Sequence, residues 1–247
     1  FGNCEQLSVS KTFFSVMSFI GNRAFAGSGI SEVDLLCPHF IGDFAFSSMA
    51  RLKSITAEIT SVPASFAYNC KNLQSVVLPF VKVINAGAFA CNPKLTGLTM
   101  PTSVILYSRA FYETGLTSVN LSNAEFEGSS HFECCFHLKR IIFTILMVKI
   151  PPRFCYGCTQ LKSLVTMVDG QPRNRVIHSS GKLGSLIPSD SSCVKYNFVD
   201  DYDQAIPALP SDCVMAPKFL TIVHSAFEWC KNLAEVNLWN THQVKAK

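Results

Sequence analysis

The chain has 247 residues, of which 48% are hydrophobic and 15% are charged, so it can bury a sizeable core and is not a disordered tail. The net charge is +4 and the Lys and Arg residues are scattered, so no nucleic-acid partner is expected. The longest apolar run, residues 141–150, is too short to span a bilayer, and any membrane link is expected only through parts of the protein that this sequence does not contain.

An Ala-Phe motif recurs along the chain at a nearly constant interval. The stretch IGNRAFAGSGISEVDL at 20–35 returns as IGDFAFSSMARLKSIT at 41–56. With the residue after Ala as a marker, the markers fall 21 to 23 residues apart at positions 25, 46, 67, 89, 111, 132 and 155, and one more lies at 227. Two repeats carry the Phe one place earlier, as Phe66 and Phe154, which leaves Ala67 and Cys155 at the marker. This regularity predicts a fold built by repetition.

Each repeat contains the same predicted elements in the same order. An apolar anchor precedes the marker, at Ile20, Ile41, Val62, Ile84, Leu106, Phe126, Ile150 and Ile222. Three residues after the marker the sequence often has Cys, as at Cys4, Cys70, Cys135, Cys158 and Cys230. An alternating Leu-x-x-Val-x-Leu run follows at 30–35, 52–57, 73–78, 95–100, 116–121, 138–143, 161–166 and 233–238, and it predicts one short half-buried strand per repeat.

The marker and Cys positions are predicted to lie in the core of the stack. We expect one buried column of aromatic side chains at Phe25, Phe46, Phe89, Phe111, Phe132 and Phe227. The Cys positions are expected to be small, buried and reduced, because free Cys behaves as a small hydrophobe. Disulfides are expected instead among the residues outside this register, Cys37, Cys91, Cys193 and Cys213, without a specific pairing.

The repeat resembles that of the BspA-like leucine-rich repeat family, which reads roughly Ile-Gly-x-x-Ala-Phe-x-x-Cys-x-x-Leu-x-x-Val-x-Leu-Pro. The match is clearest in INAGAFACNPKLTGLTMP at 84–101 and IVHSAFEWCKNLAEVNL at 222–238. The resemblance implies a right-handed leucine-rich repeat superhelix, with short parallel strands on the concave face and irregular or short helical segments on the convex face. It also implies a cell-surface or secreted protein that binds host proteins, matrix or other cells.

The chain divides into three predicted parts. Residues 1–166 are leucine-rich repeats, of which the first is truncated, because FGNCEQL begins in the middle of a repeat; we therefore expect the chain to be a fragment. Residues 167–216 lose the register and are rich in Gly, Pro and Ser, which indicates either degenerate repeats or an irregular island, with the island favoured. Residues 217–247 form a final repeat and a tail.

Candidate chemistry is sparse. The segment HFECCFHL at 131–138 offers His131, Cys134, Cys135 and His137, but adjacent Cys residues are not the usual spacing of metal ligands and Cys135 lies at the repeat's Cys position, so no metal is predicted. No nucleophile elbow, phosphate-binding Gly loop or paired-carboxylate motif is present. The chain is therefore predicted to be neither an enzyme nor a cofactor-binding protein.

The outward positions of the predicted strands form the candidate binding surface. In the middle of the stack these positions hold Ser54, Thr56, Ser75, Val77, Thr99, Ser118, Asn120, Arg140 and Ile142. Such a flat ladder suits a macromolecule better than a metabolite, although small hydroxyl side chains also simply fit a crowded parallel sheet. The leading hypothesis is a non-enzymatic protein-binding or adhesion module. The rivals are an intracellular, cytoplasmic scaffold or regulator, and an enzyme whose chemistry lies in 167–216 or outside this chain.

Overall fold

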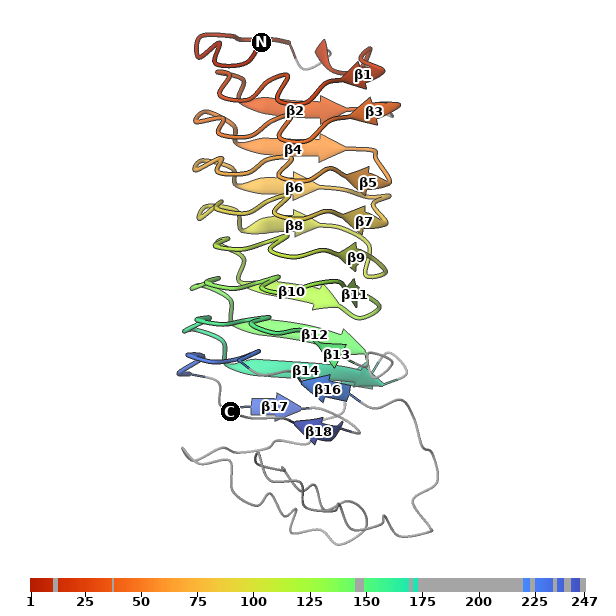
Figure 1. The fold of residues 1–247 in the computed structure, drawn as a ribbon, viewed down its shortest axis with the longest axis vertical. Helices are drawn as coiled ribbons and strands as arrows, with labels where there is room; N and C mark the ends of the chain where they lie inside the picture. Colours follow the sequence, from red (N-terminus) through yellow and green to blue (C-terminus); the bar gives the residue numbers. More distant parts are fainter. Residues whose placement is uncertain are drawn as a thin grey trace, which may run out of the picture.

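The structure is a computed structural model that describes residues 1–10, 13–36, 38–144, 149–168, 171–172, 220–222, 225–232, 235–237 and 241–244. Successive coils of chain stack along the long axis, and each coil adds strands to ladders that run down the stack (Figure 1). Within the described ranges no segment forms an α-helix, so none of them offers a helix that could cross a membrane. The predicted repeat solenoid is confirmed, whereas the short helices allowed on its convex side are absent from the described part of the chain.

The predicted Leu-x-x-Val-x-Leu segments form parallel strands on one side of the stack. One sheet contains β2 (Glu32–Leu35), β4 (Ser54–Ala57), β6 (Ser75–Val77) and β8 (Gly97–Thr99). A second contains β10 (Ser118–Leu121), β12 (Arg140–Thr144), β14 (Ser163–Val168) and β17 (Glu235–Asn237), with β15 (Gln171–Pro172) antiparallel to β14. Equivalent residues of successive repeats are register partners, as Ile55 is to Val76, so the alternation buries the same positions in coil after coil.

The apolar anchors before the markers also lie in strands, which the sequence did not predict. They belong to β1 (Phe19–Ile20), β3 (Phe40–Ile41), β5 (Ser61–Val62), β7 (Val83–Ile84), β9 (Ile105–Leu106), β11 (Glu125–Phe126), β13 (Lys149–Ile150) and β16 (Leu220–Ile222). With β18 (Thr241–Val244), these strands pair in parallel as β1–β3, β5–β7–β9–β11 and β13–β16–β18. Strands of two residues are too short to show a period, so only their stacking reveals them.

An aromatic column runs through the core of the stack. Phe25, Phe46, Phe89, Phe111 and Phe132 are buried as predicted, whereas Phe227 in the last coil is only partly buried. Phe66 and Phe154, which lie one place earlier in their repeats, belong to the same column. Their ring centroids lie 5.2 Å from Phe46 and 5.3 Å from Phe132. The marker and the residue before it therefore both face the core. In most repeats the marker is Phe and the residue before it is small, whereas in the Phe66 and Phe154 repeats the order is reversed.

The third side of each coil is a tight turn around the marker. The residues two before and two after the marker have positive φ in almost every coil, as in Arg109 (58°) and Glu113 (52°) around Phe111. Backbone bonds such as Phe46 N–H to Phe66 O (2.9 Å) link these turns to the next coil. The left-handed positions let the chain reverse within a few residues, even though few of them are Gly.

Most of the recurring cysteines satisfy carbonyl groups that point into the core, but Cys4 is exposed and Cys230 is only partly buried, contrary to the prediction. The thiols of Cys70, Cys135 and Cys158 donate to the marker carbonyls of the preceding repeats, with Sγ–O distances of 3.1, 3.0 and 3.0 Å. Asn92 occupies the same position and donates to Ala67 O (2.9 Å) and Phe89 O (2.7 Å). In these coils the position supplies a donor to a core carbonyl that would be costly to leave unpaired, whereas Met49 at the same position carries no donor.

The last coil packs directly on the coil that contains Cys155. Strand β14 pairs with β17, and Cys155 N–H donates to Ala226 O (2.7 Å). No further coil lies between them in the described stack, and the choice between degenerate repeats and an irregular island in 167–216 stays a prediction. The body of the predicted part 167–216 lies outside the described residues, and its boundaries stay predictions.

Candidate functional site: a groove where the sheet is interrupted

The long-strand ladder is interrupted once, between β8 and β10. At the start of each long strand a backbone N–H donates to the equivalent carbonyl one coil earlier: Lys53 to Ser31, Gln74 to Lys53, Thr96 to Gln74, Lys139 to Thr117 and Lys162 to Lys139. The corresponding bond from Thr117 to Thr96 is missing from this series within the described chain, and β8 and β10 belong to different sheets. Figure 1 shows a wider space between these two strands than between the strands above them.

The interruption is closed at both ends. Gly115 N–H donates to Asn92 O (3.2 Å) before β10, and Asn123 N–H donates to Thr102 O (3.2 Å) after it. On the opposite side of the stack, β9 and β11 pair without a break. The coils therefore stay in contact around most of their circumference and part only along β8 and β10, where the segment 93–101 is longer than the segment 116–122 that faces it.

Gly115 explains how the coils can approach so closely beside the opening. A Cβ atom at this position would lie 2.3 Å from the carbonyl oxygen of Pro93, so no other residue fits without a backbone shift. The turn after Phe111 is also one residue shorter than the turns after Phe89 and Phe132, counted from the marker to the next Leu. The shortened turn holds Gly115 against the previous coil, and beyond Gly115 the two coils separate along β8 and β10.

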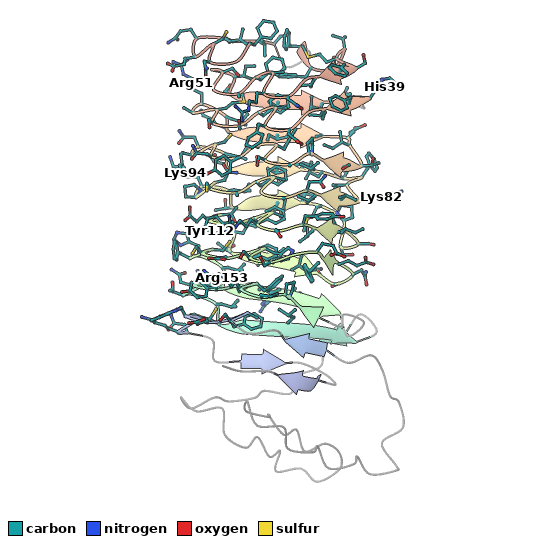
Figure 2. The ribbon with its side chains drawn as sticks, in the orientation of Figure 1. His39, Arg51, Lys82, Lys94, Tyr112 and Arg153 are labelled. Atoms are coloured by element: carbon teal, nitrogen blue, oxygen red, sulfur yellow. The ribbon has the colours of Figure 1, made fainter. Side chains whose placement is uncertain are left out.

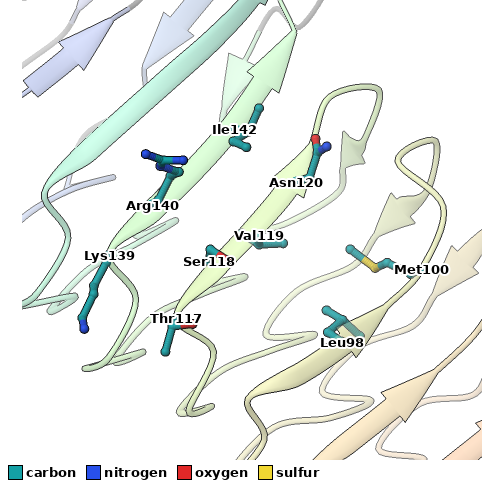
Figure 3. A pocket seen from close by; sticks show the side chains of 9 residues that line it. All are labelled: Leu98, Met100, Thr117, Ser118, Val119, Asn120, Lys139, Arg140 and Ile142. Carbon is teal, nitrogen blue, oxygen red and sulfur yellow. The ribbon is translucent and has the colours of Figure 1, made fainter. Parts of the chain in front are cut away.

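The opening forms a groove of about 600 Å³, which we call the seam groove. Its walls are made of Leu98, Met100, Thr117, Ser118, Val119, Asn120, Lys139, Arg140 and Ile142 (Figure 3). Leu98 is the register partner of Val76, yet Val76 is fully buried and Leu98 only partly buried. Met100 is likewise only partly buried, whereas Leu78, the equivalent residue one coil earlier, is fully buried. The seam groove thus exposes side chains of the core register.

The groove combines this apolar floor with positive charge. Lys139 and Arg140 are both exposed and lie at its β12 edge, and none of its nine lining residues is acidic. Thr117, Ser118 and Asn120 add hydroxyl and amide groups along β10. Chemically, the site can cover an apolar group and pair with an anionic one, and its nine lining residues include no Cys, His, Asp or Glu.

The structure divides the predicted binding surface into two parts. Ser54 pairs in register with Ser75, and Thr56 with Val77, which in turn pairs with Thr99. Ser118 pairs with Arg140, and Asn120 with Ile142, in the other sheet. The expected single flat ladder of adjacent rows is therefore wrong at one place, because the break between β8 and β10 separates Thr99 from Ser118.

Sequence reasoning placed four of the lining residues on this surface and missed five. Ser118, Asn120, Arg140 and Ile142 were predicted there, and the missed residues are Leu98, Met100, Thr117, Val119 and Lys139. Leu98, Met100 and Val119 occupy core positions of the alternation, so the pattern assigns them to the interior. The one sequence signal for the opening is the shortened turn ETGL at 113–116, which lacks the residue that its neighbours contain.

The HFECCFHL segment does not converge on a site. His131 is buried, and its Nε2 lies 3.0 Å from Leu106 O and 3.1 Å from Glu127 O. Cys135 points into the core, whereas Cys134 is partly exposed and burial raises the pKa of its thiol. No group of three or more metal-ligating side chains occurs within the described ranges.

A polar cluster lies along the turn edge, where Figure 2 shows Tyr112 and Arg153. Arg153 donates to both carboxylate oxygens of Glu133 and lies 3.9 Å over the Tyr156 ring. Burial opposes the charge on Glu133, yet hydrogen bonds from Arg153 and Ser130 hold the pKa of this carboxyl below its usual value. Cys91 lies near this cluster as a free thiol whose pKa is raised by burial, so it is not an activated nucleophile. The cluster joins neighbouring coils.

Comparison with known proteins supports the repeat assignment. The family model described as a BspA type leucine-rich repeat region matches residues 1–90 and 82–169, in six copies. A leucine-rich repeat protein from Bacteroides ovatus is similar in structure, with a TM-score of 0.51 and 19% identity over 99% of this chain and 70% of that one. A leucine-rich cell surface protein from Faecalibacterium prausnitzii gives a TM-score of 0.38 and 14% identity, covering 97% of this chain and 87% of that one. No curated protein matches the chain.

Proposed function

Because the chain belongs to the BspA-type leucine-rich repeat family, we propose that it is a non-enzymatic protein-binding module that uses its long-strand face as the contact surface. The observation that carries this proposal is the seam groove, where Leu98 and Met100 of the core register are left partly uncovered beside Arg140. Apolar surface left open in a folded domain, with a charged rim, is typical of an interaction site. The outward residues of the long strands on either side of the groove extend this surface, since neighbouring strands lie about 4.8 Å apart.

Arg140 and Ile142 are the proposed anchors of the interface. Arg is enriched among the residues that contribute most to binding, and Ile142 is a half-buried apolar side chain on the solvent side of the sheet. The two residues lie on the same strand, next to Ser118 and Asn120 of β10. A protein partner needs about 800 Å² on each side, so the groove together with the adjoining rows supplies an area of the right order.

The proposal is tested with a partner identified by a binding screen against extracellular matrix and cell-surface proteins. We expect Arg140→Glu with Ile142→Ser to weaken binding at least tenfold. The matched control is Lys82→Glu with Val83→Ser, which makes the same changes of charge and apolarity in the short-strand ladder, away from the proposed contact surface. A third protein carries a short linker in place of residues 170–213. Normal binding by the first variant together with lost binding by the third would place the contact in the inserted segment.

We also propose that the protein acts at the cell surface or is secreted, on the basis of its family. The second candidate, an intracellular scaffold that uses the same face, is favoured by one observation: the eight described cysteines are all free, and Cys4, Cys91 and Cys134 are at least partly accessible. Protease treatment of intact cells that produce the protein distinguishes the two locations. Cleavage without lysis supports the surface location, and protection until lysis supports the scaffold.

A further inference from the structure

We propose that the seam groove accepts an extended peptide segment of a partner as an additional strand between β8 and β10, an inference that rests on the proposed binding function. The first support is the backbone itself. Thr117, just before β10, and Ser118, its first residue, lack the donor bond to the preceding coil that their equivalents Lys139 and Arg140 make to Thr117 O. On the other edge, the Gln74 carbonyl oxygen accepts a bond from Thr96 N–H, whereas the equivalent Thr96 carbonyl oxygen accepts none from Thr117 N–H. Two strand edges with free main-chain groups therefore face one another.

An added strand would restore both sets of bonds at once. A strand usually joins a sheet at one outer edge, through main-chain hydrogen bonds on one side. Here β8 and β10 flank the groove from both sides, and the wider space between them is visible in Figure 1. The closing contacts at Gly115 and Asn123 limit the inserted segment to a few residues, which matches the three to four residues of β8 and β10.

The chemistry of the groove specifies the side chains of the peptide. Alternate residues of a strand point to opposite faces, so an inserted strand turns every second side chain inward against Leu98 and Met100. The residues between them point outward beside Ser118 and Asn120 of β10, and Arg140 lies one strand further, as the register partner of Ser118. The occupant is thus a segment in which apolar and acidic residues alternate, because apolar groups cover the exposed core and carboxylates complement the two cations.

The experiment is a selection from a displayed library of random decapeptides, on the whole chain. We expect the enriched peptides to contain alternating apolar and acidic residues over at least three positions. Arg140→Glu with Ile142→Ser should weaken their binding at least tenfold, and Lys82→Glu with Val83→Ser, on the opposite ladder, should leave it unchanged. Methylation of the backbone nitrogens that would face β8 or β10 should weaken binding at least tenfold, although it leaves every side chain in place.

Hydrogen exchange separates strand insertion from ordinary docking. A bound peptide should slow exchange at the Thr117 and Ser118 amides at least tenfold. Peptides that respond to the groove variant but bind equally well when methylated, without protecting Thr117, would overturn strand insertion and leave the proposed function standing. A selection that enriches no peptide would also overturn strand insertion. It would leave the proposed function to the separate binding measurement with a folded protein partner. Peptides that ignore the groove variant would contradict both proposals for this site.

Discussion

At the scale of single residues, Phe89 shows how the repeat stabilises itself. Its ring is fully buried in the middle of the aromatic column, with centroids 6.0 Å from Phe66 and 5.7 Å from Phe111. Replacing Phe89 with Ala removes a core aromatic between two neighbours and should lower the free energy of unfolding by about 3–5 kcal/mol. Chemical denaturation followed by circular dichroism measures this change. Phe80 is 58% exposed, and Phe80→Ala is the matched control with an expected cost under about 1 kcal/mol.

His131 gives the stack a predictable sensitivity to acid. Burial lowers its pKa from 6.5 to about 4, so the folded state keeps the ring neutral where the unfolded chain protonates it. The buried neutral His131 therefore costs the folded state no stability above about pH 6.5. As the pH falls below that value, the unfolded chain gains a proton that the folded state does not, so the free energy of unfolding decreases. The decrease is complete below about pH 4, where both states are protonated. The total loss is about 3 kcal/mol. Unfolding measured between pH 7 and 4 should show this decline.

The variant His131→Phe isolates the contribution of the histidine. Phe66 and Phe154 already occupy the equivalent position, which indicates that an aromatic ring can be accommodated there. Whatever its stability at pH 7, the variant should lose less stability than the parent between pH 6.5 and 4, since the carboxylates contribute equally to both. Identical pH profiles for the two proteins would contradict the assignment of a buried neutral His131.

The cysteine positions predict a division of thiol reactivity. Burial raises the pKa of Cys70 to about 12 and that of Cys155 to about 11, and both side chains are inaccessible. Thiol labelling of the native protein should therefore reach Cys4, Cys91 and Cys134 and should miss Cys70 and Cys155 until the chain is denatured. Mass spectrometry that found Cys70 labelled in the native protein, or in a disulfide, would refute its place in the core.

At the scale of the elements, Gly115 fixes the edge of the seam groove. Gly115→Ala places a Cβ atom against backbone, 2.3 Å from Pro93 O, so the coils must separate further; we expect a loss of about 1–3 kcal/mol in the free energy of unfolding. Gly21→Ala is the matched control, because its Cβ atom would meet nothing closer than Phe19 Cε1 at 3.9 Å. Equal stability of the two variants would show that the coils do not approach as closely at Gly115 as described.

The long strands could be predicted from the sequence because alternation is a local signal. Leu52, Ile55 and Ala57 show it within six residues, and all three are buried. The second ladder could not be predicted, because most of its strands have only two residues, and a strand such as β7 is recognised only through its pairing with β5 and β9. The left-handed turn residues were missed for a related reason: Arg109 and Glu113 are not residue types that indicate positive φ.

At the scale of the whole molecule, the seam groove is a property of two coils together. The residues around it follow the repeat, and Leu98 and Val119 occupy ordinary core positions. The opening arises because the segment 93–101 and the shorter segment 116–122 are held together at Gly115 and at Asn123. A mismatch between neighbouring repeats leaves no motif in either one. The sequence could therefore indicate the face on which Arg140 and Ile142 lie but not the break beside them.

Hydrogen exchange of the free protein, resolved to single amides by NMR, tests the interrupted sheet most directly. The amides of Thr96 and Lys139 are bonded to Gln74 and Thr117 in the coils before them, whereas the Thr117 amide makes no such bond to Thr96. Thr96 and Lys139 should therefore exchange slowly, at rates limited by opening of the stack, and Thr117 should exchange at least a hundredfold faster. Protection of Thr117 equal to that of Thr96 and Lys139 would mean that the sheet is continuous and that the groove does not exist.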